Sequence, residues 1–134
     1  MNRHPKGFSI DECVEKAARY ISENGSCLLL FDVIGSRKYD TYETRNTLQQ
    51  RIFAMAKDIN SRFDRYFPLS NINCICDYEK GFEKILGDGS WAAINDASVI
   101  PEIIQYQKTH YPDVPLYWGV AIDGFDDEGM KLVK

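Results

Sequence analysis

The sequence has little that would suit a membrane, an extracellular compartment or a basic nucleic-acid surface. No apolar run approaches the ~20 residues of a membrane span, and the polar N-terminus has no signal-peptide core behind it. Acidic residues outnumber basic ones, 20 to 16, whereas non-specific nucleic-acid binders carry an excess of Lys and Arg. We therefore expect a cytoplasmic protein with no membrane segment, and we do not expect a nucleic-acid partner.

Cysteine and histidine are also sparse. The chain has four cysteines and two histidines, and only Cys74 and Cys76 lie close together in sequence, with no histidine near them. Zinc sites typically use C-x2-C pairs, so this spacing does not favour zinc. We expect reduced, mostly buried thiols.

What is present indicates one globular domain. The 134 residues are 44% hydrophobic, 13% aromatic and 27% charged, which excludes intrinsic disorder and a coiled coil. There are no internal repeats. We predict a single domain over residues 1–134, with residues 1–25 as an N-terminal helical extension and residues 26–134 as the core.

Local patterns predict the elements. Ser9 and Glu12 form a capping box that opens a helix, and Asn24-Gly25 ends it. Residues 71–81 allow either a short strand around 72–76 or an irregular insertion. The other predicted elements are a buried strand over 27–34, a helix over 44–67, strands over 82–86 and 90–94, a helix opened by 95–98, a strand over 116–122 and a short final strand over 130–133.

After the first helix, this order is the βαββαβ order of the ferredoxin-like fold, an α/β (α+β) architecture. It predicts an antiparallel sheet with both core helices on one face and with the strand over 27–34 beside the strand over 90–94. Asp32 ends the first of these strands, and Asp88 lies in the turn before the second. The two aspartates are therefore expected to be neighbours.

Two interpretations of this aspartate pair are open. A carboxylate late in a buried strand is costly, and a second one nearby adds repulsion, unless Mg²⁺ or Mn²⁺ lies between them. Gly35, Ser36 and Gly89 leave room for phosphates, and Arg37 can neutralise them. Alternatively, Asp32 braces a turn and Gly-Asp-Gly is an ordinary hairpin tip.

Three segments resemble the class III nucleotidyl cyclases. Residues 30–37 (LFDVIGSR) resemble the family's first metal motif, F-x-D-I-x-G. Residues 83–93 (EKILGDGSWAA) resemble its hairpin, K-x-x-G-D-x-F/Y-M-A, and residues 117–124 (YWGVAIDG) are similar to its following strand. The first motif is also similar to that of SatD-type proteins, and the GGDEF and CRISPR-associated polymerase palms share the topology.

The resemblance implies a nucleoside triphosphate and two metal ions at one site. Asp32 and Asp88 match the family's catalytic, metal-binding aspartates, and Val33 matches a carbonyl ligand of one metal. Lys84 matches the base-selecting position, where lysine accompanies adenine, which favours ATP over GTP; it is equally well explained as a solvated strand lysine. The resemblance implies a homodimer. The expected nucleotide-binding residues are Val33, Ile34, Gly35, Ser36, Arg37, Lys84 and Gly87.

Two departures from the family pattern bear on activity. The cyclases continue with an N-x-x-x-A-x-R segment, which this sequence does not show before Lys134, and Arg37 replaces a small residue. Arg37, Lys38 and Arg45 are weak substitutes for the family's arginine. The sequence thus predicts a metal-dependent nucleotide-binding palm, a nucleotidyl cyclase or nucleotidyltransferase. The alternatives are a non-catalytic nucleotide-sensing or regulatory module and a structural dimerisation module.

Overall fold

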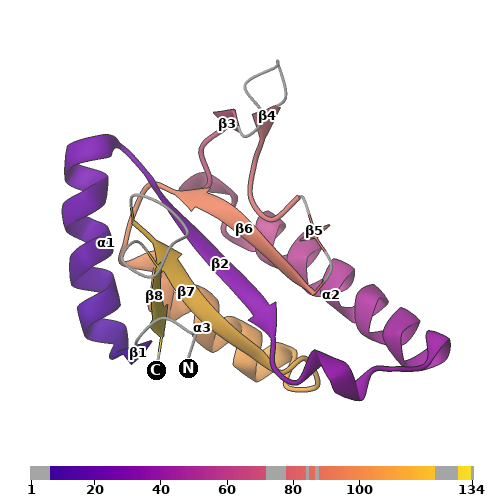
Figure 1. The fold of residues 1–134 in the computed structure, drawn as a ribbon. Coiled ribbons are helices and arrows are strands. Elements are labelled where there is room, and N and C mark those ends of the chain that lie inside the picture. Colours follow the sequence, from indigo (N-terminus) through magenta and orange to yellow (C-terminus); the bar gives the residue numbers. More distant parts are fainter. Residues whose placement is uncertain (1–6, 72–77, 84, 87, 123–129, 134) are drawn as a thin grey trace.

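A six-stranded sheet forms the centre of the molecule. The computed structural model describes residues 7–71, 78–83, 85–86, 88–122 and 130–133, and the sheet has the order β1-β8-β7-β2-β6-β5 (Figure 1). The short β3 and β4 form a separate ladder. The strands are β1 (Gly7–Phe8), β2 (Cys27–Val33), β3 (Ser70–Asn71), β4 (Tyr78–Glu79), β5 (Ile85–Leu86), β6 (Gly89–Ile94), β7 (Leu116–Ala121) and β8 (Met130–Val133).

The described residues also contain three α-helices and two 3-10 turns. These are α1 (Ile10–Asn24), η1 (Ser36–Lys38), α2 (Tyr42–Arg62), η2 (Asp64–Tyr66) and α3 (Val99–His110). The predicted start of α1 is confirmed, because the Ser9 hydroxyl accepts the Glu12 N–H at 3.2 Å. Its predicted end is also confirmed, with Gly25 as the C-cap. Within these residues, no helix combines the length and the apolar character that crossing a bilayer requires.

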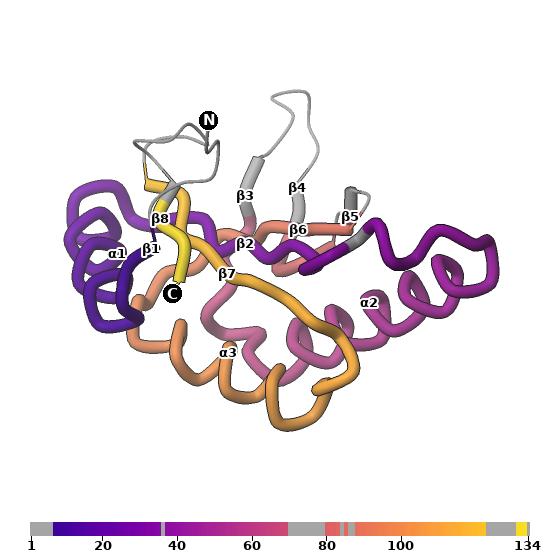
Figure 2. The backbone as a smooth tube through the Cα atoms, turned by 60° about the horizontal axis from the view of Figure 1, so that its bottom comes forward, coloured from indigo at the N-terminus to yellow at the C-terminus, as the bar shows by residue number. Residues whose placement is uncertain are grey.

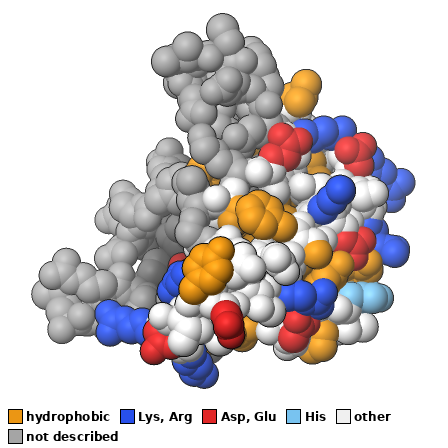
Figure 3. All heavy atoms as spheres, turned by 90° about the vertical axis from the view of Figure 1, so that its right-hand side faces the viewer, with side chains coloured by type: hydrophobic (Ala, Val, Ile, Leu, Met, Phe, Trp, Pro, Cys, Tyr) orange, Lys and Arg blue, Asp and Glu red, His pale blue; other side chains and the backbone are white. Residues whose placement is uncertain are grey.

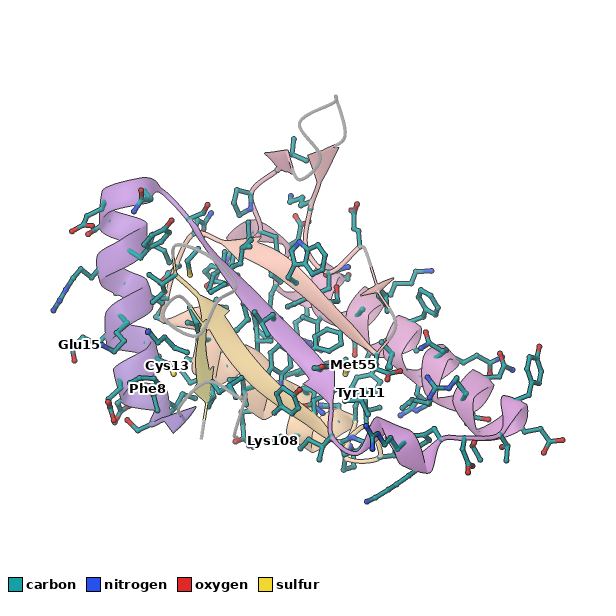
Figure 4. All side chains as sticks on the ribbon, viewed as in Figure 1. Phe8, Cys13, Glu15, Met55, Lys108 and Tyr111 are labelled. Carbon is teal, nitrogen blue, oxygen red and sulfur yellow. The ribbon has the colours of Figure 1, made fainter. Side chains whose placement is uncertain are left out.

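The core lies between the sheet and two of the helices. Figure 2 shows α2 and α3 on the same face of the sheet. The side chains of β2 alternate accordingly, with those directed at the helices buried and those on the other face partly exposed. Phe31 packs against Phe82 and Trp118, with ring centroids 5.3 and 5.4 Å away, and Met55, labelled in Figure 4, is fully buried in this layer.

The predicted pairing of the central strands is confirmed. β2 pairs antiparallel with β6, with Cys27 opposite Ile94 and Asp32 opposite Gly89. On its other side β2 pairs antiparallel with β7, with Asp32 opposite Tyr117. The end of β2 is therefore flanked by the start of β6 and the start of β7.

The prediction of a wholly antiparallel sheet was wrong, because the sheet is mixed. β1 runs parallel to β8, with Gly7 opposite Leu132 and Phe8 opposite Val133. Two residues are too few to show a strand periodicity, so no sequence pattern marks β1. Helix α1 lies at this edge of the sheet, and its Cys13 is buried near Phe8 (Figure 4).

Helix α2 starts and ends earlier than residues 44–67. The Thr41 hydroxyl accepts the Thr44 N–H at 3.1 Å, and this cap starts the helix at Tyr42. The helix ends at Arg62, and η2 follows before Pro68. The buried side chains of the helix recur at helical spacing, and they are Leu48, Ile52, Met55, Ala56 and Ile59, followed by Phe63 at the C-cap.

The strand predicted over 82–86 is shorter, since β5 covers only Ile85–Leu86. The backbone of Phe82 is bound instead by the side-chain amide of Asn60 in α2. That amide donates to the Phe82 carbonyl at 3.2 Å and accepts the Phe82 N–H at 2.6 Å. Asn60 thus satisfies the groups that a longer strand would have used in the sheet.

A buried glutamine connects α3 to the sheet. Gln107 is 2% exposed, accepts the Trp118 indole N–H at 3.1 Å and donates to the Val114 carbonyl at 3.0 Å. These bonds fix the loop between α3 and β7 and therefore the place where β7 begins beside the end of β2.

We expect Gln107→Met to lower the free energy of unfolding by about 1–3 kcal/mol, because it leaves a buried indole N–H and a carbonyl without partners. The exposed Gln105 of the same helix offers a matched control, and Gln105→Met should stay within about 0.5 kcal/mol of the wild type. Urea denaturation of the three proteins measures this difference. Equal stability of both variants would show that the Gln107 bonds add nothing.

Candidate functional site

Asp32 occupies the end of β2 on the sheet face that α2 and α3 do not cover. Its Oδ1 accepts the N–H of Val33 at 3.0 Å, and its Oδ2 accepts the Tyr117 hydroxyl of β7 at 3.1 Å. The side chain is only partly exposed. Two neighbours therefore hold the carboxylate in a fixed direction, and each oxygen keeps a further lone pair for a ligand.

Gly89 lies opposite Asp32 in the ladder, at a position where the strands approach too closely for a side chain. A Cβ at residue 89 would lie 2.7 Å from the Phe31 carbonyl oxygen and 3.2 Å from Asp32 Oδ1. Any side chain here would force the backbone apart or displace the carboxylate. A glycine is therefore required at residue 89 for Asp32 to keep its position, whereas its predicted role in leaving room for phosphates stays a prediction.

Asp88 lies in the turn between β5 and β6, beside the end of β2. Its backbone carbonyl accepts the Val33 N–H at 3.2 Å, so the turn is bonded to the residue that follows Asp32. Its carboxylate is 3.4 Å from Nη1 of Arg45 in α2. The structure therefore brings the two aspartates to the same end of neighbouring strands, as the topology predicted.

Arg45, which the sequence offers only as a weak substitute for the family's arginine, contacts Asp88 in the structure. It lies in the first turns of α2, where its Nε donates to the Tyr39 carbonyl at 3.1 Å and its Nη1 faces Asp88. Its side chain is 48% exposed, against 16% for Asp88. Its contact with Asp88 depends on how α2 lies against the hairpin, which local sequence patterns do not report.

The turn predicted to wrap phosphates follows β2 directly. The Ile34 N–H donates to the Pro115 carbonyl at 2.8 Å, which ties the turn to the start of β7. Gly35 has φ +66, Arg37 is exposed, and the Lys38 side chain lies over Gly35. Residues 36–38 form η1, although the side chain of Ser36 is not described.

Two predicted residues cannot be placed. Lys84, the expected base-selecting residue, and Gly87, the glycine before Asp88, lie outside the described residues. The cysteines Cys74 and Cys76 also lie outside them, whereas Cys13 and Cys27 are free and buried. Burial raises the pKa of the Cys27 thiol to about 12, so it is an inert core residue.

Charges of both signs surround the site end of the molecule. Figure 3 looks at the side on which α2 begins, and basic and acidic side chains are interspersed over it. A cavity of about 450 Å³ also opens beside α2, lined by Tyr39, Glu43, Thr44, Thr47, Leu48, Arg51 and Asp113. Asp32 and Asp88 do not line it, so the candidate site is the strand end and not this cavity.

The candidate metal donors are a pair of carboxylates. Among the described residues there is no group of three or more His, Cys, Asp or Glu placed to hold a metal ion. With Asp32, Asp88 and a backbone carbonyl, the site offers oxygen donors, which suit Mg²⁺ and Mn²⁺. Their roles as metal ligands stay a prediction.

Comparisons with known proteins do not name a family for the chain. No protein-family model, no curated protein and no solved structure matched it. The resemblance to the cyclases therefore rests on the three sequence motifs.

Ionisation of Tyr117 is expected to lower the free energy of unfolding at alkaline pH. Burial, the charge of Asp32 and the hydrogen bond to it raise the pKa of Tyr117 above its ordinary value of about 10. Its contribution to folding is present below about pH 10 and is lost as the pH rises through the folded pKa. The raised pKa values of Tyr111 and Cys27 act in the same direction.

We expect Tyr117→Phe to make the loss of stability above about pH 10 shallower than in the wild type. Tyr42, which is 85% exposed, provides the control, and Tyr42→Phe should leave the slope unchanged. Urea denaturation over a pH series measures the slope. An unchanged slope for Tyr117→Phe would contradict the contact between Tyr117 and Asp32.

Proposed function

We propose that the protein binds a nucleoside triphosphate together with Mg²⁺ or Mn²⁺ at the end of β2, through Asp32 and Asp88. The observation that carries this proposal is that two aspartates from distant parts of the chain lie at the same end of neighbouring, paired strands. One comes from a strand end, the other from an adjacent turn, and the Val33 N–H bonds to the Asp88 carbonyl between them. A basic turn adjoins both residues.

The arrangement of the core supports a more specific proposal, that of a ferredoxin-like palm. Around β2 the strand order is β7-β2-β6-β5, all neighbours are antiparallel, and two helices cover one face. A split βαβ unit has this connectivity. It is also the topology that the cyclase resemblance implies, so fold and motifs favour the same function class.

The residues present fit a divalent cation. Mg²⁺ in nucleotide sites usually takes one or two carboxylates and completes its shell with water and phosphate oxygens. Asp32 is oriented by Tyr117, and the Val33 carbonyl is the further donor that the resemblance implies. The bound ion would activate a hydroxyl nucleophile and neutralise charge on the phosphates.

The turn after β2 fits the phosphate chain. Gly35 and Ser36 would approach the phosphates with backbone N–H groups, whereas the Ile34 N–H is bonded to the Pro115 carbonyl and would only fix the turn. The exposed Arg37 and Lys38 would neutralise the phosphates. Lys84 would select ATP over GTP. We propose nucleotidyl transfer or cyclisation on ATP as the reaction. If the protein binds ATP but releases no product, it is a non-catalytic nucleotide sensor.

A homodimer is part of the proposal. Leu28, Leu30 and Trp91 lie on the sheet face opposite α2 and α3 and are only partly buried in one copy. A second copy of the chain would cover such apolar groups.

A thermal-shift experiment tests the binding function. Mn²⁺ with ATP at about 100 times the dissociation constant should stabilise the wild type by about 2.7 kcal/mol. Asp32→Asn and Asp88→Asn should each remove most of this gain, because each deletes a negative metal ligand. Asp113→Asn is the matched control, since Asp113 also pairs with an arginine of α2, and it should keep the full gain.

If Mn²⁺ with ATP stabilises Asp32→Asn and Asp88→Asn as much as the wild type, these carboxylates only shape the turns. Product analysis then separates the two binding functions. Pyrophosphate released by the wild type but not by Asp88→Asn identifies an enzyme. Binding without any product from the four nucleoside triphosphates identifies a sensor.

A further inference from the structure

Two ion pairs on helix α2 differ in how firmly they are made. Arg51 donates two hydrogen bonds to Asp113, from Nε to Oδ2 at 2.7 Å and from Nη2 to Oδ1 at 2.9 Å. Arg45 reaches Asp88 with one long contact of 3.4 Å from Nη1 to Oδ1. The first is the strong bidentate geometry, whereas the second is at the limit of a hydrogen bond.

The other end of the Arg45 guanidinium is anchored. Nε donates to the Tyr39 carbonyl at 3.1 Å, in the loop between the predicted phosphate turn and α2. The guanidinium is therefore held in place at Nε while Nη1 faces the carboxylate that the proposed metal would take. Because its side chain is half exposed, Nη1 can exchange Asp88 for an incoming anion without a large loss of packing.

We propose that Arg45 is a counter-ion of Asp88 that gives way to the divalent cation and then binds the phosphate chain. This inference rests on the proposed function and specifies how metal and nucleotide binding are coupled. Without nucleotide, the positive guanidinium disfavours a cation at Asp88. With a triphosphate present, the same group gains an anionic partner, so metal and triphosphate favour each other's binding.

This coupling gives Arg45→Met effects of opposite sign in two binding experiments. Mn²⁺ alone should bind about tenfold more tightly, because a unit positive charge near the ion has gone. Tripolyphosphate and ATP at saturating Mn²⁺ should bind about tenfold to a hundredfold more weakly, because a charge-assisted hydrogen bond has gone. Tripolyphosphate reports on the phosphate contact without any contribution from the base.

Mn²⁺ binding is measured from the electron paramagnetic resonance signal of the free ion, and binding of tripolyphosphate and ATP by titration calorimetry. Arg51→Met is the matched control, an arginine of the same helix paired with an aspartate, and it should leave both affinities within about twofold. Arg45→Lys keeps the charge but loses the fork, so it should retain weak binding of Mn²⁺ alone and lose part of the phosphate affinity. If Arg45→Met does not fold, Arg45→Lys still tests the inference.

The outcomes separate the inference from the proposed function. If Asp32→Asn abolishes Mn²⁺ binding but Arg45→Met weakens both affinities or changes neither, Arg45 is a structural residue and the proposed function stands. If the wild type binds no Mn²⁺, either alone or together with ATP, that Asp32→Asn removes, both are overturned. The coupling is established if Arg45→Met raises the affinity for Mn²⁺ alone and lowers the affinity for tripolyphosphate and ATP, while Arg51→Met changes neither affinity.

Discussion

The pairing of β2 with β6 is the constraint on which the candidate site depends. It places Asp32 opposite Gly89, and it bonds the Val33 N–H to the carbonyl of Asp88 at 3.2 Å. A slip of one residue would turn Asp32 into the core and move Gly89 away from it. The register is fixed by the alternation of β2, whose buried side chains fit against α2 and α3.

The site follows from this pairing through electrostatics. Two aspartates lie at one strand end, and each carboxylate has a separate partner: Tyr117 for Asp32 and Arg45 for Asp88. The tyrosine comes from β7 and the arginine from α2, so the site joins the sheet to the helix layer.

Much of the scaffold could be predicted from local sequence, because caps and periodicity are local. Ser9 and Gly25 mark the ends of α1, and the apolar run and the Gly-Asp-Gly turn identified the central strands and their neighbours. The missing information was long-range. Asn60 binding Phe82, Tyr117 binding Asp32 and Arg45 facing Asp88 each join residues far apart in the chain, and β1 is too short to leave a periodicity.

The most direct measurement of the central claim is a crystal structure of the protein with Mn²⁺ and ATP, with the metal located by its anomalous scattering. The account predicts a manganese peak bound by carboxylate oxygens of both Asp32 and Asp88, with Arg45 turned from Asp88 to the phosphates. Manganese held elsewhere, with the contacts of Asp32 to Tyr117 and of Asp88 to Arg45 unchanged, would contradict it.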